Sequence, residues 1–228
     1  MGFIITYYHM KKVAIVIPTI VNYSGLIRDI NSLKSNKYQL RYYIIDNSGF
    51  NNGVAKSWNM GIKKAIDDGI DTFIISNDDI EIHNDHLDRF IDLFLNQKKY
   101  GLISGIRECD YDPLTVEKEI FDNELGPDFA FFILSKKTYE KVGKFDEKFY
   151  PAYFEDGDFN YRCKLLKIKT GKASHCIFSH GISSSIFLLP EHQKILVEQG
   201  FVANSFRYIE KWGGGVHSEI YKNPYNKD

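Results

Sequence analysis

Three neighbouring polar residues, Asn77-Asp78-Asp79, follow an apolar run and have the spacing of a metal–phosphate site. Adjacent carboxylates repel each other unless a cation or hydrogen-bond donors offset their charge. Mg²⁺ and Mn²⁺ bind one or two protein carboxylates together with substrate phosphates. A polar turn before the next helix explains the same residues, and for these residues taken alone it is the simpler interpretation.

A second acidic group, Glu155-Asp156 with Asp158, opens a predicted helix. One interpretation is a general base that takes a proton from a sugar hydroxyl. The other is simple capping, because carboxylates in a first helical turn favour the helix dipole. The aromatic residues around this group suit a sugar ring and are Phe149, Tyr150, Tyr153, Phe154 and Phe159.

Two further polar residues stand just after, or late in, predicted strands. His180 comes late in one such strand, before the serines at 183–185, and Asp46 follows another. A lone histidine is more often structural than a ligand, and an aspartate in this position often bonds its own turn. Neither residue decides a function by itself.

The elements that position these residues alternate along the chain. Near-continuous apolar runs predict buried parallel strands at 13–18, 42–46 and 72–76, and apolar residues at helical spacing lie between them. A third helix is expected to open at Asn84-Asp85. This alternation predicts an α/β domain with a mostly parallel sheet.

The second half of the chain is less regular. We expect a strand at 129–135, a short helix capped by Ser135 that ends near Gly143, and a strand at 173–181. Ligands of open α/β sheets collect at the carboxyl ends of the strands, so the polar residues after each strand should face one site.

Composition excludes some classes of protein. The 228 residues carry 29 basic and 30 acidic side chains, for a net charge of −1, so no broad basic face for nucleic acid is expected. The three cysteines (Cys109, Cys163 and Cys176) form no disulfide or zinc pattern and suit a reducing compartment. No apolar run approaches the ~20 residues of a membrane span, and no secretory signal is evident, so we expect a cytoplasmic protein.

The joint order of these features resembles family 2 of the glycosyltransferases, which has the GT-A fold. The resemblance covers roughly residues 12–185. It includes NNGVAKSWNMGIKKAI at 51–66 and VGKFDEKFYPAYFEDGDFNYR at 142–162, of which the second block is the more specific. EKWGGG at 210–215 is similar to a Lys-Trp-Gly-Gly element of some bacterial members.

The resemblance implies a donor site and a divalent metal. Pro18, Thr19 and Asp46 would line the pocket for the nucleotide base, and Asp78 would face the ribose. Asp79 would bind Mn²⁺ or Mg²⁺ on the diphosphate, with His180 completing the metal site. Asn77 stands where many relatives have the first aspartate of an Asp-x-Asp motif, so this chain departs from the two-carboxylate pattern.

The resemblance also implies the chemistry. Asp156 would be the catalytic base, and Glu155 or Asp158 would orient the acceptor. Arg162 fits the block, and a purely structural role for it stays open. The expected reaction is an inverting transfer of a single sugar, most simply from a UDP-hexose, to a hydroxyl of a glycan or glycoconjugate. We expect one GT-A domain over 1–228. Its nucleotide-binding half would span 10–125, its acceptor half 126–190, and a C-terminal helical tail would cover 191–228.

Two other functions stay open. A sugar nucleotidyltransferase would place a Gly-rich, Arg-containing loop after the first strand, where this chain has PTIVNYSG. The same segment lacks the glycine patterns of dinucleotide-binding and P-loop proteins. The other is a non-catalytic carbohydrate-binding module on the same fold. Asp79, Asp156 and His180 argue against it, because a binding module needs no base.

Overall fold

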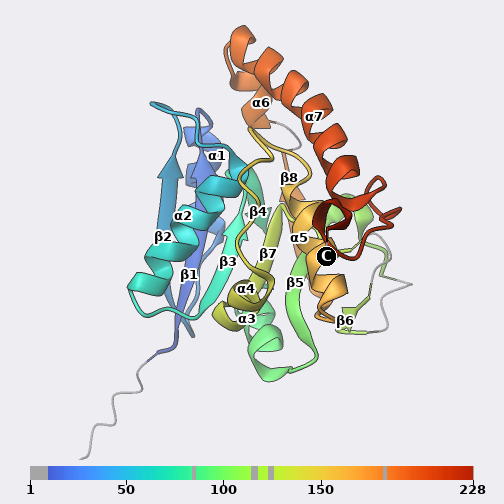
Figure 1. Ribbon diagram of the computed structural model, residues 1–228. Helices are drawn as coiled ribbons and strands as arrows, with labels where there is room; N and C mark the ends of the chain where they lie inside the picture. The colour runs from blue at the N-terminus through green and yellow to red at the C-terminus, as the bar shows by residue number, and fades with distance from the viewer. Residues whose placement is uncertain (1–9, 84–85, 114–117, 123–125, 182–183, 228) are drawn as a thin grey trace, which may run out of the picture.

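The computed structural model describes residues 10–83, 86–113, 118–122, 126–181 and 184–227. Within these ranges a sheet carries helices on both faces (Figure 1). The strands are β1 (Lys12–Thr19), β2 (Gln39–Asp46), β3 (Thr72–Ser76), β4 (Ile80–Ile82), β5 (Tyr100–Arg107), β6 (Ile120–Phe121), β7 (Phe131–Ser135) and β8 (Lys169–His180). The helices are α1 (Tyr23–Ser32), α2 (Val54–Asp67), α3 (His86–Asn96), α4 (Lys136–Val142), α5 (Glu155–Leu165), α6 (Ser184–Leu188) and α7 (Glu191–Trp212), with short 3₁₀ turns η1 (Glu108–Asp110) and η2 (Pro224–Asn226).

The sheet has the strand order β2-β1-β3-β7-β5-β8-β4, and β6 pairs with β8. β1 is parallel to β2 and β3, and β5 is parallel to β8. β7 lies between β3 and β5 and is antiparallel to both, so the five strands β1, β2, β3, β5 and β8 all run in one direction. The predicted fold class, α/β with a mostly parallel central sheet flanked by helices, is confirmed.

β1 shows why the apolar runs are continuous. Val13, Ile15 and Ile17 pack on one face of the sheet, against α1 and α3. Ala14 and Val16 pack on the other, against α2 and the elements that follow β7. All five side chains are fully buried, because helices cover both faces of the sheet and neither set of alternating residues meets water.

The short helix after β7 forms as its sequence predicts. The Ser135 hydroxyl accepts a hydrogen bond from the Thr138 N–H at 3.1 Å, which caps α4. Gly143 ends the helix with a φ of 88°, a backbone conformation that favours glycine. β5 was not predicted from the sequence, and the expected helix start at Asn84-Asp85 lies outside the described residues.

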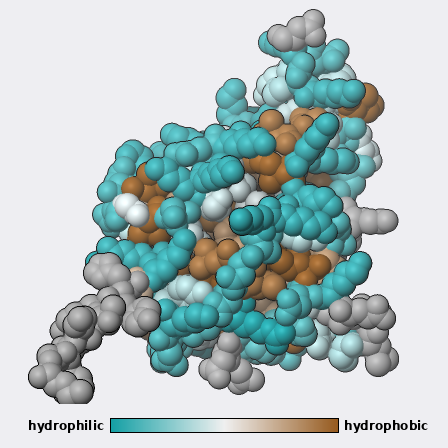
Figure 2. Space-filling view, turned by 90° about the horizontal axis from the view of Figure 1, so that it is seen from below, coloured by the Kyte–Doolittle hydropathy of each residue, from teal (hydrophilic) through white to brown (hydrophobic). Residues whose placement is uncertain are grey.

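The C-terminal part of the chain lies beside and beyond the sheet. α7 runs along the upper right of Figure 1, with α6 near its start, and ends where Gly213 adopts a left-handed φ of 74°. The face seen from below is mostly hydrophilic, with hydrophobic residues in patches between (Figure 2). No helix in the described ranges has the length and apolarity needed to cross a bilayer.

Candidate active site

A cavity of about 400 Å³ lies at the carboxyl ends of β1 and β3, between these ends and the start of α5. Its lining includes eight of the nine site residues predicted from the sequence, which are Pro18, Thr19, Asn77, Asp78, Asp79, Glu155, Asp156 and His180. These residues come from four separate parts of the chain. The fold therefore brings them to one place, as expected of the carboxyl edge of an open α/β sheet.

Asp78 lies on the floor of the cavity with only 5 % of its surface exposed. Its Oδ2 accepts a hydrogen bond from the Thr19 hydroxyl at 2.7 Å, and its Oδ1 accepts one from the Ser185 hydroxyl at 2.6 Å. Burial raises the pKa of Asp78, and these two donors partly oppose that shift. The carboxylate thus links the end of β1 to α6 across the cavity.

Asp79 and His180 form a close pair. His180 Nε2 lies 3.1 Å from Asp79 Oδ1, and the side chains are 10 % and 6 % exposed. The pairing of β4 with β8 places them together, because Ile80 is the register partner of His180 and Gly181 N–H donates to the Asp79 carbonyl at 3.0 Å. Residues a hundred positions apart therefore present an oxygen and a nitrogen to the same point.

The pair fits a particular kind of metal site. The described residues contain no group of three His, Cys, Asp or Glu side chains that could hold a metal ion. Two protein donors, one of them a carboxylate, suit a divalent cation that takes its remaining ligands from water and substrate phosphates. His180 Nδ1 is buried and has no hydrogen-bond partner among the described residues, and the ring also contacts Phe178.

Asp156 and Glu155 begin α5 at the opposite wall. Asp156 is half-buried, and its Oδ1 accepts a hydrogen bond from the Gly157 N–H at 2.7 Å. Glu155 is 5 % exposed, and its Oε2 has no hydrogen-bond partner in the described part of the chain. Burial raises the pKa of both carboxyl groups, that of Glu155 well above its ordinary value.

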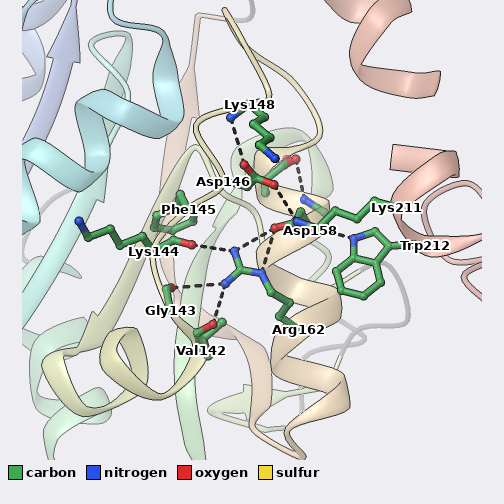
Figure 3. Close-up of polar contacts among 12 residues, drawn as sticks. Val142, Gly143, Lys144, Phe145, Asp146, Lys148, Asp158, Arg162, Lys211 and Trp212 are labelled. Carbon is green, nitrogen blue, oxygen red and sulfur yellow. Dashed lines mark hydrogen bonds and ion pairs between the residues drawn. The ribbon is translucent and has the colours of Figure 1, made fainter. Parts of the chain in front are cut away.

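Asp158 does not line the cavity, and this corrects one role that the resemblance implied for it. It has no exposed surface, and it accepts hydrogen bonds from Arg162 Nε at 2.9 Å and Trp212 Nε1 at 2.9 Å (Figure 3). Lys211 Nζ lies 2.6 Å from its Oδ1. These structural donors occupy the oxygens of Asp158. Asp158 and Asp156 are two residues apart in one helix, so their side chains point to different sides of it.

Arg162 makes structural contacts, which is one of the two roles that the sequence left open for it. Besides Asp158, its guanidinium donates to the carbonyl oxygens of Val142 at 2.7 Å and Lys144 at 2.9 Å (Figure 3). These contacts hold the end of α4 and the residues just after it against α5. The rest of the loop before α5 is held by Asn204 of α7, whose Nδ2 donates to the Ala152 carbonyl at 2.9 Å.

Asp46 is the predicted site residue that is not part of the cavity lining. It is exposed at the end of β2, and its Oδ1 accepts the Ser48 N–H at 2.9 Å, a bond that lowers its pKa. It is the register partner of Thr19, which does line the cavity. Asp46 therefore stands next to the site and bonds its own turn.

The cavity also holds a charged pair that was not predicted from the sequence. Arg107 ends β5, and its Nη2 lies 3.2 Å from Oδ1 of Asp128, a second contact joining its Nε to the other oxygen. Both residues line the cavity. Arg107 is the last residue of β5, and the glycines and serine of this strand interrupt its apolar residues, so no apolar run pointed to it in the sequence. The cavity is also bordered by Trp58, whose buried Nε1 has no partner among the described residues.

Comparisons with known proteins identify the fold. No family model matches the chain, and no curated protein matches it by sequence. The crystal structure of GalNAc-T7 with UDP, GalNAc and Mn²⁺ matches with a TM-score of 0.65 and 12 % identity, over 90 % of this chain and 48 % of that one. The catalytic domain of Drosophila β1,4-galactosyltransferase 7, in complex with xylobiose, matches with a TM-score of 0.54 and 15 % identity, over 75 % of this chain and 71 % of that one.

The chain therefore spans about half the length of the GalNAc-T7 chain that it matches. At these identities the likeness is one of fold, and the fold is that of GT-A glycosyltransferases. Membership of family 2 in particular stays a hypothesis from the sequence blocks.

Proposed function

We propose that this protein is a glycosyltransferase that moves a single sugar, with inversion, from a nucleotide-diphosphate sugar to a hydroxyl of a glycan or glycoconjugate. The observation that carries the proposal is that the Asp79–His180 pair and Asp156 line one cavity of a GT-A fold. UDP-hexose is the donor that we favour. Two of the structures that match the fold are of glycosyltransferases, and one of them contains UDP and Mn²⁺.

In this proposal Asp156 is the general base. It would accept the proton of the acceptor hydroxyl as that oxygen attacks the anomeric carbon of the donor sugar. Burial raises the pKa of Asp156, which makes its carboxylate more basic than an exposed one. Glu155, whose pKa is raised further, would keep its proton and offer a neutral carboxyl to the acceptor.

The donor would lie on the other side of the cavity. Pro18 and Thr19, with Asp46 beside them, would contact the base, Asn77 would lie beside the nucleotide, and Asp78 would accept hydrogen bonds from the ribose. Asp79 and His180 would hold a Mn²⁺ or Mg²⁺ ion, which supplies positive charge to the departing nucleoside diphosphate. The buried Nε1 of Trp58 and Oε2 of Glu155 are further groups that a polar ligand could satisfy.

A thermal-unfolding experiment tests this function without knowledge of the acceptor. We expect UDP to raise the unfolding temperature only when MnCl₂ is present, because ligands of the native state stabilise it. Asp79→Asn should lose that increase, whereas the control Asp67→Asn, at an exposed position, should keep it. Stabilisation by UDP that is independent of metal, or none at all, would refute the donor site proposed here.

A further inference from the structure

Two further cavities adjoin the active-site cavity in a row on the side of Asp156, and we call this row the groove. A second cavity of about 260 Å³ adjoins the first and shares Phe129, Tyr153 and Asp156 with it. Asp156 thus stands between the proposed donor cavity and this second space. A base that bridges two compartments in this way can face a donor on one side and an acceptor on the other.

The groove continues into a third cavity of about 410 Å³. The second and third cavities share Gly157, Asn160, Val216 and His217. One wall is therefore α5, and the other includes the tail after α7. Gly157 keeps the two walls close, because a Cβ at this position would lie 3.2 Å from Val216 Cγ2.

The α5 wall has a regular direction. Asp156, Asn160 and Lys164 are four residues apart, so they lie on the same face of the helix. Eight helical residues span about 12 Å, which exceeds one sugar ring and suits a short oligosaccharide. Beyond Lys164 the third cavity is lined by Lys167 and Lys169.

The middle of the groove is aromatic. Phe154 and Phe201 both line it, and their ring centroids are 5.3 Å apart. Phe201 is 48 % exposed although it is a large apolar side chain. Tyr153 and Phe154 have left-handed φ values of 75° and 74°, a costly conformation that turns the loop at this point. Partly exposed aromatic rings of this kind offer apolar surface for sugar rings.

The far end of the groove is positively charged. The third cavity is lined by Lys164, Lys167 and Lys169. Glu219 is the acidic residue in the same lining. The Glu219 carboxylate already accepts hydrogen bonds from the Tyr208 hydroxyl at 2.6 Å and the His217 N–H at 3.1 Å. Among the described residues, neither Lys164 nor Lys167 forms an ion pair with a carboxylate. Unpaired lysines around a hollow create a positive potential that favours an anionic ligand.

We propose that the acceptor is an anionic oligosaccharide or glycoconjugate that lies in this groove. Its reacting hydroxyl meets Asp156, its sugar rings pass Phe154 and Phe201, and a carboxylate or phosphate further along binds Lys164 and Lys167. The inference rests on the proposed function, because it assigns the acceptor class of the same site.

Binding of small anionic probes tests the proposal. Tetragalacturonate supplies carboxylates on a sugar chain, its fully methyl-esterified form is a neutral match, and inorganic tripolyphosphate supplies phosphate without sugar. Calorimetric titration would be run without metal on the wild type and on the double variant Lys164→Glu/Lys167→Glu. We expect at least one anionic probe to bind the wild type, and the double variant to bind it about tenfold or more weakly, since charge-assisted hydrogen bonds are lost.

Lys141→Glu is the matched control. Lys141 is also a lysine in the last turn of a helix, α4, but it lines none of the three cavities, so its reversal should leave probe affinity unchanged. If the double variant binds tetragalacturonate more weakly than the wild type does, the anionic group of the acceptor is assigned as a carboxylate. If only its affinity for tripolyphosphate falls, the group is assigned as a phosphate. Equal affinity of wild type and double variant, binding of the ester as tight as that of the acid, or no binding of either anion would overturn the inference.

The UDP experiment separates this inference from the proposed function. The double variant should still be stabilised by UDP with Mn²⁺, because Lys164 and Lys167 lie outside the donor cavity. If UDP stabilises the double variant, a negative result with the anionic probes refutes the proposed acceptor class and leaves the proposed function standing. If the wild type shows no UDP effect, the proposed function fails whatever the probes do.

Discussion

The ammonium group of Lys211 lies 2.6 Å from Oδ1 of Asp158, a carboxylate with no exposed surface. It also donates to Asp146 at 2.8 Å (Figure 3). This contact joins the last turn of α7 to the first turn of α5. The tail that follows Trp212 forms a wall of the groove, so the buried pair positions that wall relative to Asp156.

Removing the Lys211 charge should destabilise the protein strongly. Lys211→Met keeps most of the aliphatic stem but leaves the buried Asp158 and the partly buried Asp146 with one donor fewer each, and breaking a buried pair costs about 3 kcal/mol or more. Lys63→Met is the control, because Lys63 pairs with Asp67 at the surface, where a pair is worth about 0.5 kcal/mol. Urea unfolding measures both, and similar small losses in the two variants would contradict the structural role of Lys211.

Glu155 should make the stability of the protein fall as pH rises. Burial raises its pKa well above the ordinary value, and the negative charge of Asp156 adds to the shift. Above the unfolded pKa of about 4.3 the unfolded chain loses this proton while the folded protein keeps it, so deprotonation favours unfolding.

Glu155→Gln removes that penalty. The variant should therefore unfold at a higher temperature than the wild type at pH 7–8, and the gain should shrink towards pH 4. Glu81→Gln, at an exposed position in β4, should show no such trend. Thermal unfolding across this pH range checks the sign, and a variant less stable than the wild type at neutral pH would show that the glutamate ion is favoured in the fold.

Gly61 should resist even a small substitution. A Cβ at this position would lie 2.2 Å from Cγ1 of Val16, so α2 packs directly on β1 there. Gly61→Ala should cost about 1–3 kcal/mol, the usual range for overpacking a core. At Gly49 a Cβ would meet nothing within 4 Å, so Gly49→Ala should leave the free energy of unfolding nearly unchanged. Equal values for the two variants would mean that α2 can move away from the sheet at little cost.

Much of the fold could be predicted because its strands are buried on both faces. β1 and β3 appear in the sequence as unbroken apolar runs, and Asp79 could be placed because it follows one of them. β5 could not, because the segment YGLISGIR contains two glycines and a serine, so its apolar residues form no such run. Arg107 ends this strand, so the Arg107–Asp128 pair could not be placed at the site from the sequence either.

The two acidic residues of α5 show a second limit. Asp156 lines the cavity and Asp158 is fully buried, although they are two residues apart in one helix. Each residue advances about 100° around a helix, so which carboxylate faces the cavity depends on how the helix is rotated. The rotation is set by the contacts of Asp158 with Lys211 and Trp212, fifty residues further along the chain, and local sequence does not specify it.

The proposed ribose contact of Asp78 can be tested with two nucleotides. Asp78→Asn should weaken binding of UDP in the presence of Mn²⁺ about tenfold, because a charge-assisted hydrogen bond is lost. The same substitution should change the affinity for 2′,3′-dideoxy-UDP little, because this nucleotide lacks the ribose hydroxyls that would donate hydrogen bonds to the Asp78 carboxylate. Calorimetry measures both, and an equal loss for the two nucleotides would assign Asp78 to holding Thr19 and Ser185 in place.

The central claim is that Asp156 acts as a base beside a nucleotide-sugar site held by Asp79 and His180. Its most direct test is the release of UDP from a panel of UDP-hexoses with Mn²⁺, with water as the acceptor, in the wild type, Asp156→Asn and the exposed control Asp110→Asn. We predict release by the wild type and the control, and a rate about 10²–10⁴ times lower for Asp156→Asn, with UDP stabilisation unchanged. A near-normal rate in Asp156→Asn would contradict this account.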